Sequence, residues 1–270
     1  HVDTRLQSGD EVRIPPIRYT EKESEHSAPP LKLSEMPPIL FEDQNIMVVD
    51  KLAGMASHGG SGISYGLIER MRASRPELPF LELVHRLDRG TSGVLVLAKT
   101  RKALVRLHEM IREGEMHKTY QALVKGDWQN DRQHAKFPLF KYVTPSGERR
   151  VRVDPENGLP SHSIFRLKER FGPVSLVEVD LLTGRTHQIR VHAAELGFPL
   201  VGDEKYGDFA FNDEVAHGSL GVPFKRMFLH SGKICFHHPI TGEELEIEAP
   251  LPKDCVELIE VLEQRKAQNK

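Results

Sequence analysis

The chain has 270 residues, of which 39% are hydrophobic, and this is enough for one large core or two modest ones. Its 37 Lys and Arg residues nearly balance its 39 Asp and Glu residues, and the net charge is −2, so a polyanionic partner would require positive charge concentrated on one face. Two cysteines are too few for a disulfide framework and favour a reducing compartment, and no apolar run approaches the ~20 residues of a membrane span.

The first 36 residues are predicted to precede the compact part of the chain. Residues 1–16 have a short strand-and-turn pattern that ends at two prolines and is too small to bury a core. We expect them to be the last strand of a domain that lies upstream. Residues 17–36 are charged, polar and contain proline, which predicts an extended or disordered linker. Residues 37–270 are then expected to form the folded domain.

The first half of this domain alternates short apolar runs with two helical patterns. The predicted elements are strands at 39–41 and 46–49, a helix at 64–71, strands at 81–84 and 94–98, and an amphipathic helix capped by Thr100. A glycine-rich loop at 58–62 lacks the lysine and the spacing of a phosphate-binding P-loop. A flexible lid or turn is therefore the better interpretation of that loop.

The second half contains mainly paired strands. The predicted elements are a strand at 118–125, a hairpin of 163–167 with 174–182, a helix at 186–196, a hairpin of 228–236 with 244–247, and a terminal helix at 254–263. Strand pairs outnumber strand–helix–strand units along the chain. This pattern predicts an α+β fold with a mainly antiparallel sheet.

The loop at 85–93, His-Arg-Leu-Asp-Arg-Gly-Thr-Ser-Gly, carries one carboxylate among two arginines and a histidine. Loops held by a rigid scaffold often carry the chemistry of an enzyme, and cationic neighbours favour the ionised form of Asp88. The loop therefore predicts a base or a nucleophile rather than a proton donor. Asp88, Ser92 and His85 are also the residue types of a hydrolase triad, but no nucleophile elbow surrounds Ser92, and a turn residue is the simpler interpretation.

A second pattern, Leu-Leu-Thr-Gly-Arg-Thr-His-Gln-Ile-Arg-Val-His, occupies residues 181–192. Arg185 is predicted to lie at a helix start, where backbone N–H groups and the helix dipole favour anions, and Asp88 is its natural internal partner. The alternative is that Arg185 and Arg190 are solvated helix residues. A basic residue at this end does not complement the helix dipole, and this favours anion binding.

The sequence gives less support to a metal site or to a dinucleotide-binding site. His187 and His192 are five residues apart and do not share a helix face, so we predict a hydrogen-bonding role for His187 and no metal site. No Gly-x-Gly-x-x-Gly follows a predicted strand, which argues against a dinucleotide cofactor. Tyr120 alternates within its strand and faces either the core or a cleft. Three basic clusters would supply phosphate contacts, at 101–106, 149–152 and 166–170.

Together, the motifs resemble those of the RluA-type pseudouridine synthases. The resemblance covers most of residues 39–252 and rests on four segments in the family's order, at 85–93, 118–126, 183–192 and 199–207. It implies a catalytic domain of the pseudouridine synthase type at 37–270, with a mixed central sheet flanked by helices and loops. The end of the first segment, at 9–15, is similar to the tail of an S4-like RNA-binding domain, so residues 1–16 are expected to be a remnant of one.

The resemblance implies an isomerase that acts on specific uridines of large-subunit (23S) ribosomal RNA. Such an enzyme breaks the N-glycosidic bond, rotates the uracil and rejoins its C5 to C1′, with no cofactor. Asp88 is implied as the essential carboxylate, which attacks the sugar, attacks the base or removes a sugar proton. Arg185 would pair with Asp88, and Arg86 would fill the space left by the flipped base. Tyr120 would stack on the uracil and help to remove its C5 proton.

The resemblance also implies five candidate RNA-binding residues, namely Arg86, Arg89, His187, Ile189 and Arg190. We expect a cytoplasmic monomer that binds ribosomal RNA, without a membrane, a metal or a nucleotide cofactor. Two other hypotheses remain open from the sequence. An inactive RNA-binding module would leave uridine unmodified, and an RNA nuclease or glycosidase would release a broken strand or free uracil.

Overall fold

The computed structural model of the chain describes residues 28–60 and 62–268. In chain order, its strands are β1 (Ile39–Glu42), β2 (Ile46–Lys51), β3 (Glu82–Leu83), β4 (Ser92–Ala98), β5 (His117–Lys125), β6 (Arg132–Ala135), β7 (Leu139–Val143), β8 (Arg149–Val153), β9 (Ser163–Arg170), β10 (Val174–Leu181), β11 (Leu229–His237) and β12 (Glu244–Glu248). Its helices are α1 (Leu67–Ser74), α2 (Arg101–Glu113), α3 (Gln188–Glu195), α4 (Phe209–Ala216) and α5 (Lys253–Gln268), with a short 3-10 turn η1 (Leu33–Glu35).

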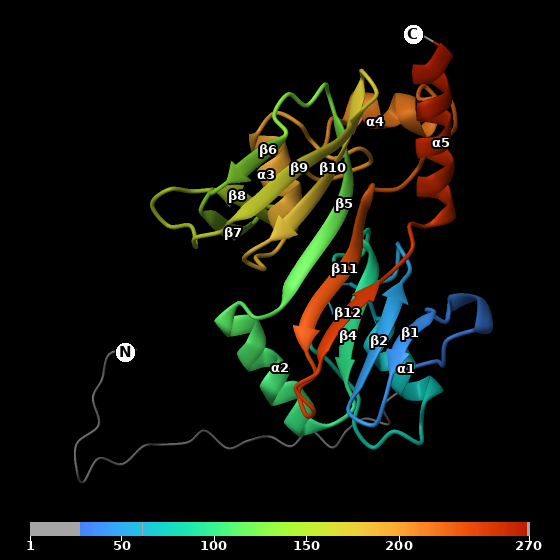
Figure 1. Ribbon diagram of the computed structural model, residues 1–270, viewed down its shortest axis with the longest axis vertical. Helices are drawn as coiled ribbons and strands as arrows, with labels where there is room; N and C mark the ends of the chain where they lie inside the picture. The colour runs from blue at the N-terminus through green and yellow to red at the C-terminus, as the bar shows by residue number, and fades with distance from the viewer. Residues whose placement is uncertain (1–27, 61, 269–270) are drawn as a thin grey trace.

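One mixed sheet of ten strands passes through the molecule, as Figure 1 shows. Eight strands follow the order β1-β2-β4-β11-β5-β10-β9-β6, while β12 pairs with β11 and β3 pairs with β4. The hairpins β1–β2, β9–β10 and β11–β12 are antiparallel, and β4 with β11 is a parallel pair. The predicted α+β fold with a mainly antiparallel sheet is confirmed.

Strand β11, which comes late in the chain, joins the two halves of the sheet. It lies between β4 and β5, which are neighbours in sequence. Gly93 permits this approach, because it has a φ of 111° and an added Cβ would lie 2.2 Å from the carbonyl oxygen of Ser231. The loop that precedes β4 is thereby brought next to β5.

Both faces of the first half of the sheet are covered. Successive side chains of a strand point to opposite faces, so β2 and β4 each contribute to two cores. Met47, Val49 and Leu95 pack with α1 on one face, whereas Ile46 and Val48 pack with α2 on the other. This explains why β2 and β4 have continuous apolar sequences rather than alternating ones. The predicted cap of α2 is confirmed, since the hydroxyl of Thr100 accepts the N–H of Ala103 at 3.2 Å.

Helices α4 and α5 cover a third core at the opposite end of the sheet from α2 (Figure 1). In this core Cys255 and Leu258 of α5 pack against Leu123 and Val174. The structure adds four elements that the sequence pattern did not indicate, namely β6, β7, β8 and α4. Strand β6 is short and lacks the apolar alternation that marks a strand, whereas β8 has only two apolar residues, Val151 and Val153, among three arginines.

The chain before β1 is attached to α1. Leu31 is buried and its N–H donates to the hydroxyl of Ser74 at 2.8 Å, and Glu35 forms an ion pair with Arg70 at 2.5 Å. The last part of the predicted linker, residues 28–36, is therefore held on the folded domain. The predicted domain remnant at 1–16 and the first part of the linker lie outside the described residues. No helix in the described part of the chain is long and apolar enough to cross a membrane.

Candidate active site

The predicted functional residues gather around one cleft of about 2170 Å³. It is lined by the loop between β3 and β4, the start of β5, and the segment that leads into α3. All eight candidate residues line this cleft, which are Arg86, Asp88, Arg89, Tyr120, Arg185, His187, Ile189 and Arg190. Motifs separated by up to about a hundred residues in the sequence therefore form one site.

The loop that carries Asp88 is held by a buried lysine and a buried serine. The hydroxyl of Ser57 donates to the carbonyl of Leu87 at 2.7 Å and accepts the N–H of Leu87 at 3.1 Å. Lys51, which is fully buried, donates to the carbonyls of Leu52 and Met55 at 2.9 and 2.7 Å and to that of Arg89, next to Asp88, at 3.4 Å. Burial lowers the pKa of Lys51 to about 7, and the negative charge of Asp88 opposes this shift. These contacts fix the backbone beside the carboxylate.

Asp88 forms an ion pair with Arg190. Its Oδ2 accepts a hydrogen bond from Nη1 of Arg190 at 3.1 Å, and its side chain remains 27% exposed toward the cleft. Arg190 also makes a bidentate contact with buried Asp203, through Nε at 2.8 Å and Nη2 at 2.7 Å. The guanidinium also lies 5.1 Å from the ring centroid of Tyr206. Arg190 is thus held by Asp203 and by the ring of Tyr206, and its Nη1 donates to Asp88.

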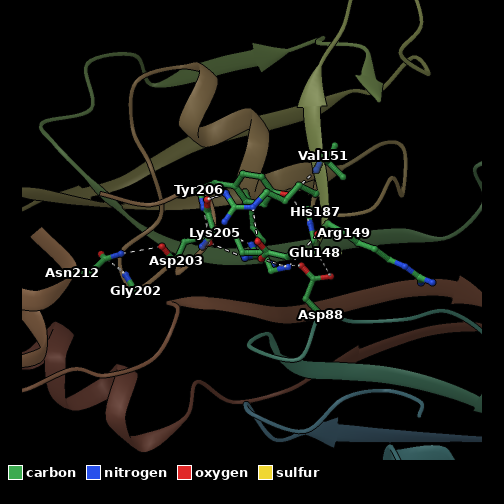
Figure 2. A network of polar contacts seen from close by, with 12 residues as sticks. Asp88, Glu148, Arg149, Val151, His187, Gly202, Asp203, Lys205, Tyr206 and Asn212 are labelled. Carbon is green, nitrogen blue, oxygen red and sulfur yellow. Dashed lines mark hydrogen bonds and ion pairs between the residues drawn. The ribbon is translucent and has the colours of Figure 1, made fainter. Parts of the chain in front are cut away.

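Asp203 belongs to the polar network drawn in Figure 2, and its ion-pair partner Arg190 is buried with it. Burial alone would raise the pKa of Asp203, but the hydrogen bonds from Arg190 and from the N–H groups of Lys205 and Tyr206 lower it below its usual value. The pKa of Arg190 is raised: burial opposes the shift, and the two carboxylates outweigh it. Both groups therefore carry their charges, and Arg190 is buried rather than available to the RNA backbone.

The predicted pair of Arg185 with Asp88 is wrong. Arg185 is exposed, and its Nε donates to the carbonyl of Pro160 at 3.2 Å. The reason is that α3 begins at Gln188 rather than at 186, so Arg185 lies in the preceding loop and Arg190 lies in the first turn. Arg190 faces the core, where it reaches both carboxylates.

Gln188 determines where this helix begins. Its Oε1 accepts hydrogen bonds from the hydroxyl of Thr183 at 2.7 Å and the N–H of Arg185 at 3.0 Å. Its Nε2 donates to the carbonyl of His162 at 3.1 Å and to the hydroxyl of Ser163 at 2.8 Å. The buried amide therefore holds residues 183–185 as a loop and prevents an earlier helix start.

His187 adopts a left-handed backbone conformation at the start of α3. Among the described residues it is the one non-glycine residue with a positive φ, of 52°. The hydroxyl of Tyr206 accepts the N–H of Val151 at 2.9 Å and is hydrogen-bonded to Nδ1 of His187 at 2.7 Å. Burial lowers the pKa of His187, although Asp88 opposes the shift. Its Nε2 lies 3.9 Å from Oδ1 of Asp88 (Figure 2).

Tyr120 lies on β5 and lines the same cleft as Asp88, the catalytic candidate. Its side chain is only 6% exposed, and it belongs both to the apolar core under α1 and to the cleft lining. Burial raises its pKa, the hydrogen bond with Ser231 opposes this, and the charge of Asp88 raises it further. The phenol therefore keeps its proton across the physiological range of pH.

The remaining candidates differ in exposure. Arg86 and Arg89 are exposed at the mouth of the cleft, and Nε of Arg89 donates to the carbonyl of Gly54 at 3.0 Å. Ile189 is 4% exposed and packs in the core under α1, where it forms part of the cleft wall. It can offer an apolar surface to a ligand but no polar contact.

The hydrolase triad finds no support in the geometry. Ser92 is buried, and its hydroxyl lies 2.9 Å from Nδ1 of His230 and accepts a hydrogen bond from Arg226 at 2.8 Å. His85 uses its Nε2 to accept the N–H of Val96 at 3.2 Å. Ser92 and Asp88 thus belong to separate networks. In the part of the chain that the structure describes, no group of three or more His, Cys, Asp or Glu residues could hold a metal ion.

Three residues of the site were not among the sequence candidates, namely Lys51, Asp203 and Tyr206. Asp203 and Tyr206 lie within the segment 199–207 that the sequence analysis identified as family-like, and that segment was the available signal. Lys51 follows an apolar strand and has no pattern of its own. Of the basic clusters, the one at 166–170 is largely neutralised, because Arg166 and Lys168 form ion pairs with Glu178.

The comparison with known proteins agrees with this geometry. Residues 45–195, more than half of the chain, match the model of a family described as RNA pseudouridylate synthase. The chain belongs to the RNA pseudouridylate synthase family. It is 49% identical to the ribosomal large subunit pseudouridine synthase C of Salmonella typhi over 96% of this chain and 81% of that protein. The protein of the same name from Escherichia coli strain K12 is 49% identical over 92% of this chain and 77% of its own length.

Solved structures of this family share the fold. The human RNA pseudouridylate synthase domain containing 1 is 26% identical, has a TM-score of 0.64, and is matched over 85% of this chain and 95% of its own. The human RNA pseudouridylate synthase domain containing 4 has a TM-score of 0.69 at 23% identity, over 83% of this chain and 92% of its own. The fold expected from the motifs is therefore confirmed.

Replacing Arg185 with glutamine is expected to raise KM by about three- to ten-fold and to leave kcat nearly unchanged. The reason is that an exposed arginine binds RNA phosphates and does not contact the Asp88 carboxylate. Steady-state kinetics of uridine modification would measure this split. A loss of kcat comparable to that of an Asp88 variant would contradict the conclusion that Arg190, rather than Arg185, pairs with Asp88.

Proposed function

We propose that this chain isomerises specific uridines of large-subunit ribosomal RNA to pseudouridine, with Asp88 as the catalytic carboxylate. The observation that carries the proposal is the Asp88–Arg190–Asp203 network, which holds the carboxylate of Asp88 against a buried guanidinium at the wall of a large cleft. The choice of RNA is supported by the names of relatives that are 49% identical over most of their length. The finer assignments below extend this proposal.

The chemistry suits a single carboxylate. The N1–C1′ bond of the uridine breaks, C5 bonds to C1′, and the proton lost from C5 is balanced by one gained at N1. Positive character develops on the sugar as the glycosidic bond breaks, and a nearby carboxylate stabilises it. Asp88 acts on the sugar, on the base or on a sugar proton, and its position in the cleft is compatible with each of these roles. No water has to be activated, so a second acid–base carboxylate is not required.

Tyr120 acts by stacking. Its ring lies in the cleft wall two residues along β5 from Lys118, and an aromatic face of this kind binds a flipped base. Because burial raises its pKa, the hydroxyl remains protonated and is a poor base for the C5 proton. We therefore assign Tyr120 to base binding in the first place.

The target uridine must leave its helix before it can react. Arg86 lies exposed beside Asp88, and in the described part of the chain its side chain forms no hydrogen bond or ion pair. A free guanidinium plane can stack between the bases that the uridine leaves behind. Arg89 offers a further contact to the RNA backbone at the same mouth of the cleft.

The Arg86→Ala variant is expected to lower kcat and the rate of base flipping by at least about ten-fold, and to weaken ground-state RNA binding by less. Flipping would be followed with a fluorescent uridine analogue in the RNA. Arg132→Ala, on an exposed position of β6 outside the cleft and outside the three basic clusters, is the matched control. Equal losses in binding and flipping would count against this role.

Tritium release from RNA labelled at uridine C5 tests the proposed function directly. Isomerisation releases tritium while the RNA strand stays intact and its mass, apart from the exchanged hydrogen, stays unchanged. A nuclease would break the strand, a glycosidase would release uracil, and a binding module would release nothing. We further propose that the enzyme works as a monomer in the cytoplasm, without a metal or a nucleotide cofactor.

A further inference from the structure

We propose that Lys118 forms a phosphate-binding subsite of the cleft, which holds a backbone phosphate of the RNA next to the flipped uridine. The inference rests on the proposed function, because the phosphate belongs to the RNA substrate. It assigns a role to a residue that contributes neither to the Asp88 network nor to the core.

The strand geometry places Lys118 beside the base-binding tyrosine. Residues two apart on a strand point to the same face, and their Cα atoms are about 6.6 Å apart. Lys118 and Tyr120 therefore share the cleft face of β5, and both line the cleft. Leu181, the register partner of Lys118 on β10, lines it as well. A flexible lysine at this position can reach the nucleotide whose base stacks on Tyr120, or its neighbour.

Lys118 differs from the other buried cations in having no partner of opposite charge. Arg190 contacts two carboxylates, and Lys51 donates to backbone carbonyls. Within residues 28–60 and 62–268, no carboxylate lies within ion-pair distance of the Lys118 ammonium and no hydrogen bond is made by it. Burial lowers the pKa of Lys118 to about 8. A partly buried cation without a partner is costly, and an anion that enters the cleft removes this cost.

The surroundings of Lys118 favour an anion rather than a neutral group. His85 lies close enough that the charge of Lys118 helps burial to lower the pKa of the imidazole. Because Nε2 of His85 accepts the N–H of Val96, its proton sits on Nδ1, which is buried and has no hydrogen-bond partner among the described residues. Arg112 and His108 of α2 line the same wall of the cleft. Glu82 also lines the cleft but is paired with Arg72 at 2.8 Å, so among the described residues no carboxylate compensates the charge of Lys118.

The Lys118→Met variant tests the assignment, because methionine keeps an unbranched apolar stem and removes the charge. Filter binding of an unmodified large-subunit ribosomal RNA transcript would be measured at several KCl concentrations. One lost phosphate contact should reduce the slope of log K against log[KCl] by about 0.7–0.9, which corresponds to about five- to eight-fold weaker binding at 0.1 M salt. The melting temperature should not fall, because the substitution removes an unpaired buried charge.

Two further variants make the result specific. Lys118→Arg should keep the salt slope of the unchanged enzyme, whether or not the methionine variant folds well. Lys168→Met removes an exposed lysine on β9 that is 3.7 Å from Glu178, and it should change neither affinity nor slope. An unchanged slope for Lys118→Met would overturn the phosphate assignment, even if affinity fell. Failure of the unchanged enzyme to release tritium would overturn the proposed function instead, and the slopes would still decide the role of Lys118.

Discussion

Replacing Asp88 with asparagine is expected to reduce tritium release on the order of 10⁴-fold, which is about 5.5 kcal/mol of transition-state stabilisation, and to leave the fold intact. Asparagine keeps the shape of the side chain and can still accept a hydrogen bond from Arg190, but it carries no charge. The Asp88–Arg190 contact is partly exposed, so its loss should change the free energy of unfolding by no more than about 1 kcal/mol. Tritium release and thermal unfolding would be measured on the same preparation.

The matched control is Asp213→Asn, which removes a carboxylate on α4 that is 77% exposed and does not line the cleft. This variant should release tritium at the rate of the unchanged enzyme. RNA binding by Asp88→Asn should persist, because the cationic cleft is unchanged. Substantial tritium release by Asp88→Asn would show that the reaction does not depend on this carboxylate.

Replacing Arg190 with methionine is expected to have the largest effect on stability. The side chain is 7% exposed, and its removal leaves Asp203, which is 1% exposed, as a buried carboxylate without its cation. Breaking a buried pair in this way costs about 3–5 kcal/mol, which corresponds to a decrease in melting temperature of roughly 10 °C for a domain of this size. Residual folded enzyme should also turn over slowly, since Asp88 loses the donor that orients it.

A double-mutant cycle separates the two contributions. Arg190→Met with Asp203→Asn no longer contains the unpaired buried charge, so it should recover a substantial part of the lost stability. It should not recover activity, because Asp88 still lacks its partner. If Arg190→Met alone melted within about 2 °C of the unchanged enzyme, the network would not have the structural role that its burial and contacts indicate.

The buried network explains how the enzyme presents a charged carboxylate in a partly enclosed cleft. Asp203 anchors Arg190 through two hydrogen bonds, and Arg190 then offers a fixed donor to Asp88. Tyr206 supports the same arrangement from its ring face and orients His187 with its hydroxyl. Asp203, Arg190 and Tyr206 therefore determine the orientation of Asp88, which faces the cleft.

Much of the fold could be predicted because its signals are local. The cap at Thr100, the hairpin of β9 with β10 and the apolar runs of β2 and β4 depend on neighbouring residues and on strand or helix period. Strand β6 and helix α4 were missed because their short sequences lack a clear apolar period. The insertion of β11 between β4 and β5 is a long-range pairing that no local pattern specifies.

The sequence by itself determined the family and the eight candidate residues that line the cleft. The charge pattern around Asp88 predicted an ionised carboxylate, and the combined motifs identified the family and the cleft-lining residues. Only the tertiary structure decided which arginine pairs with Asp88. Gln188 holds the preceding segment as a loop through four hydrogen bonds, α3 therefore begins at Gln188, and Arg190 rather than Arg185 faces Asp88 and Asp203. A helix start that depends on contacts with His162 and Ser163, more than twenty residues away, cannot be determined from the local sequence.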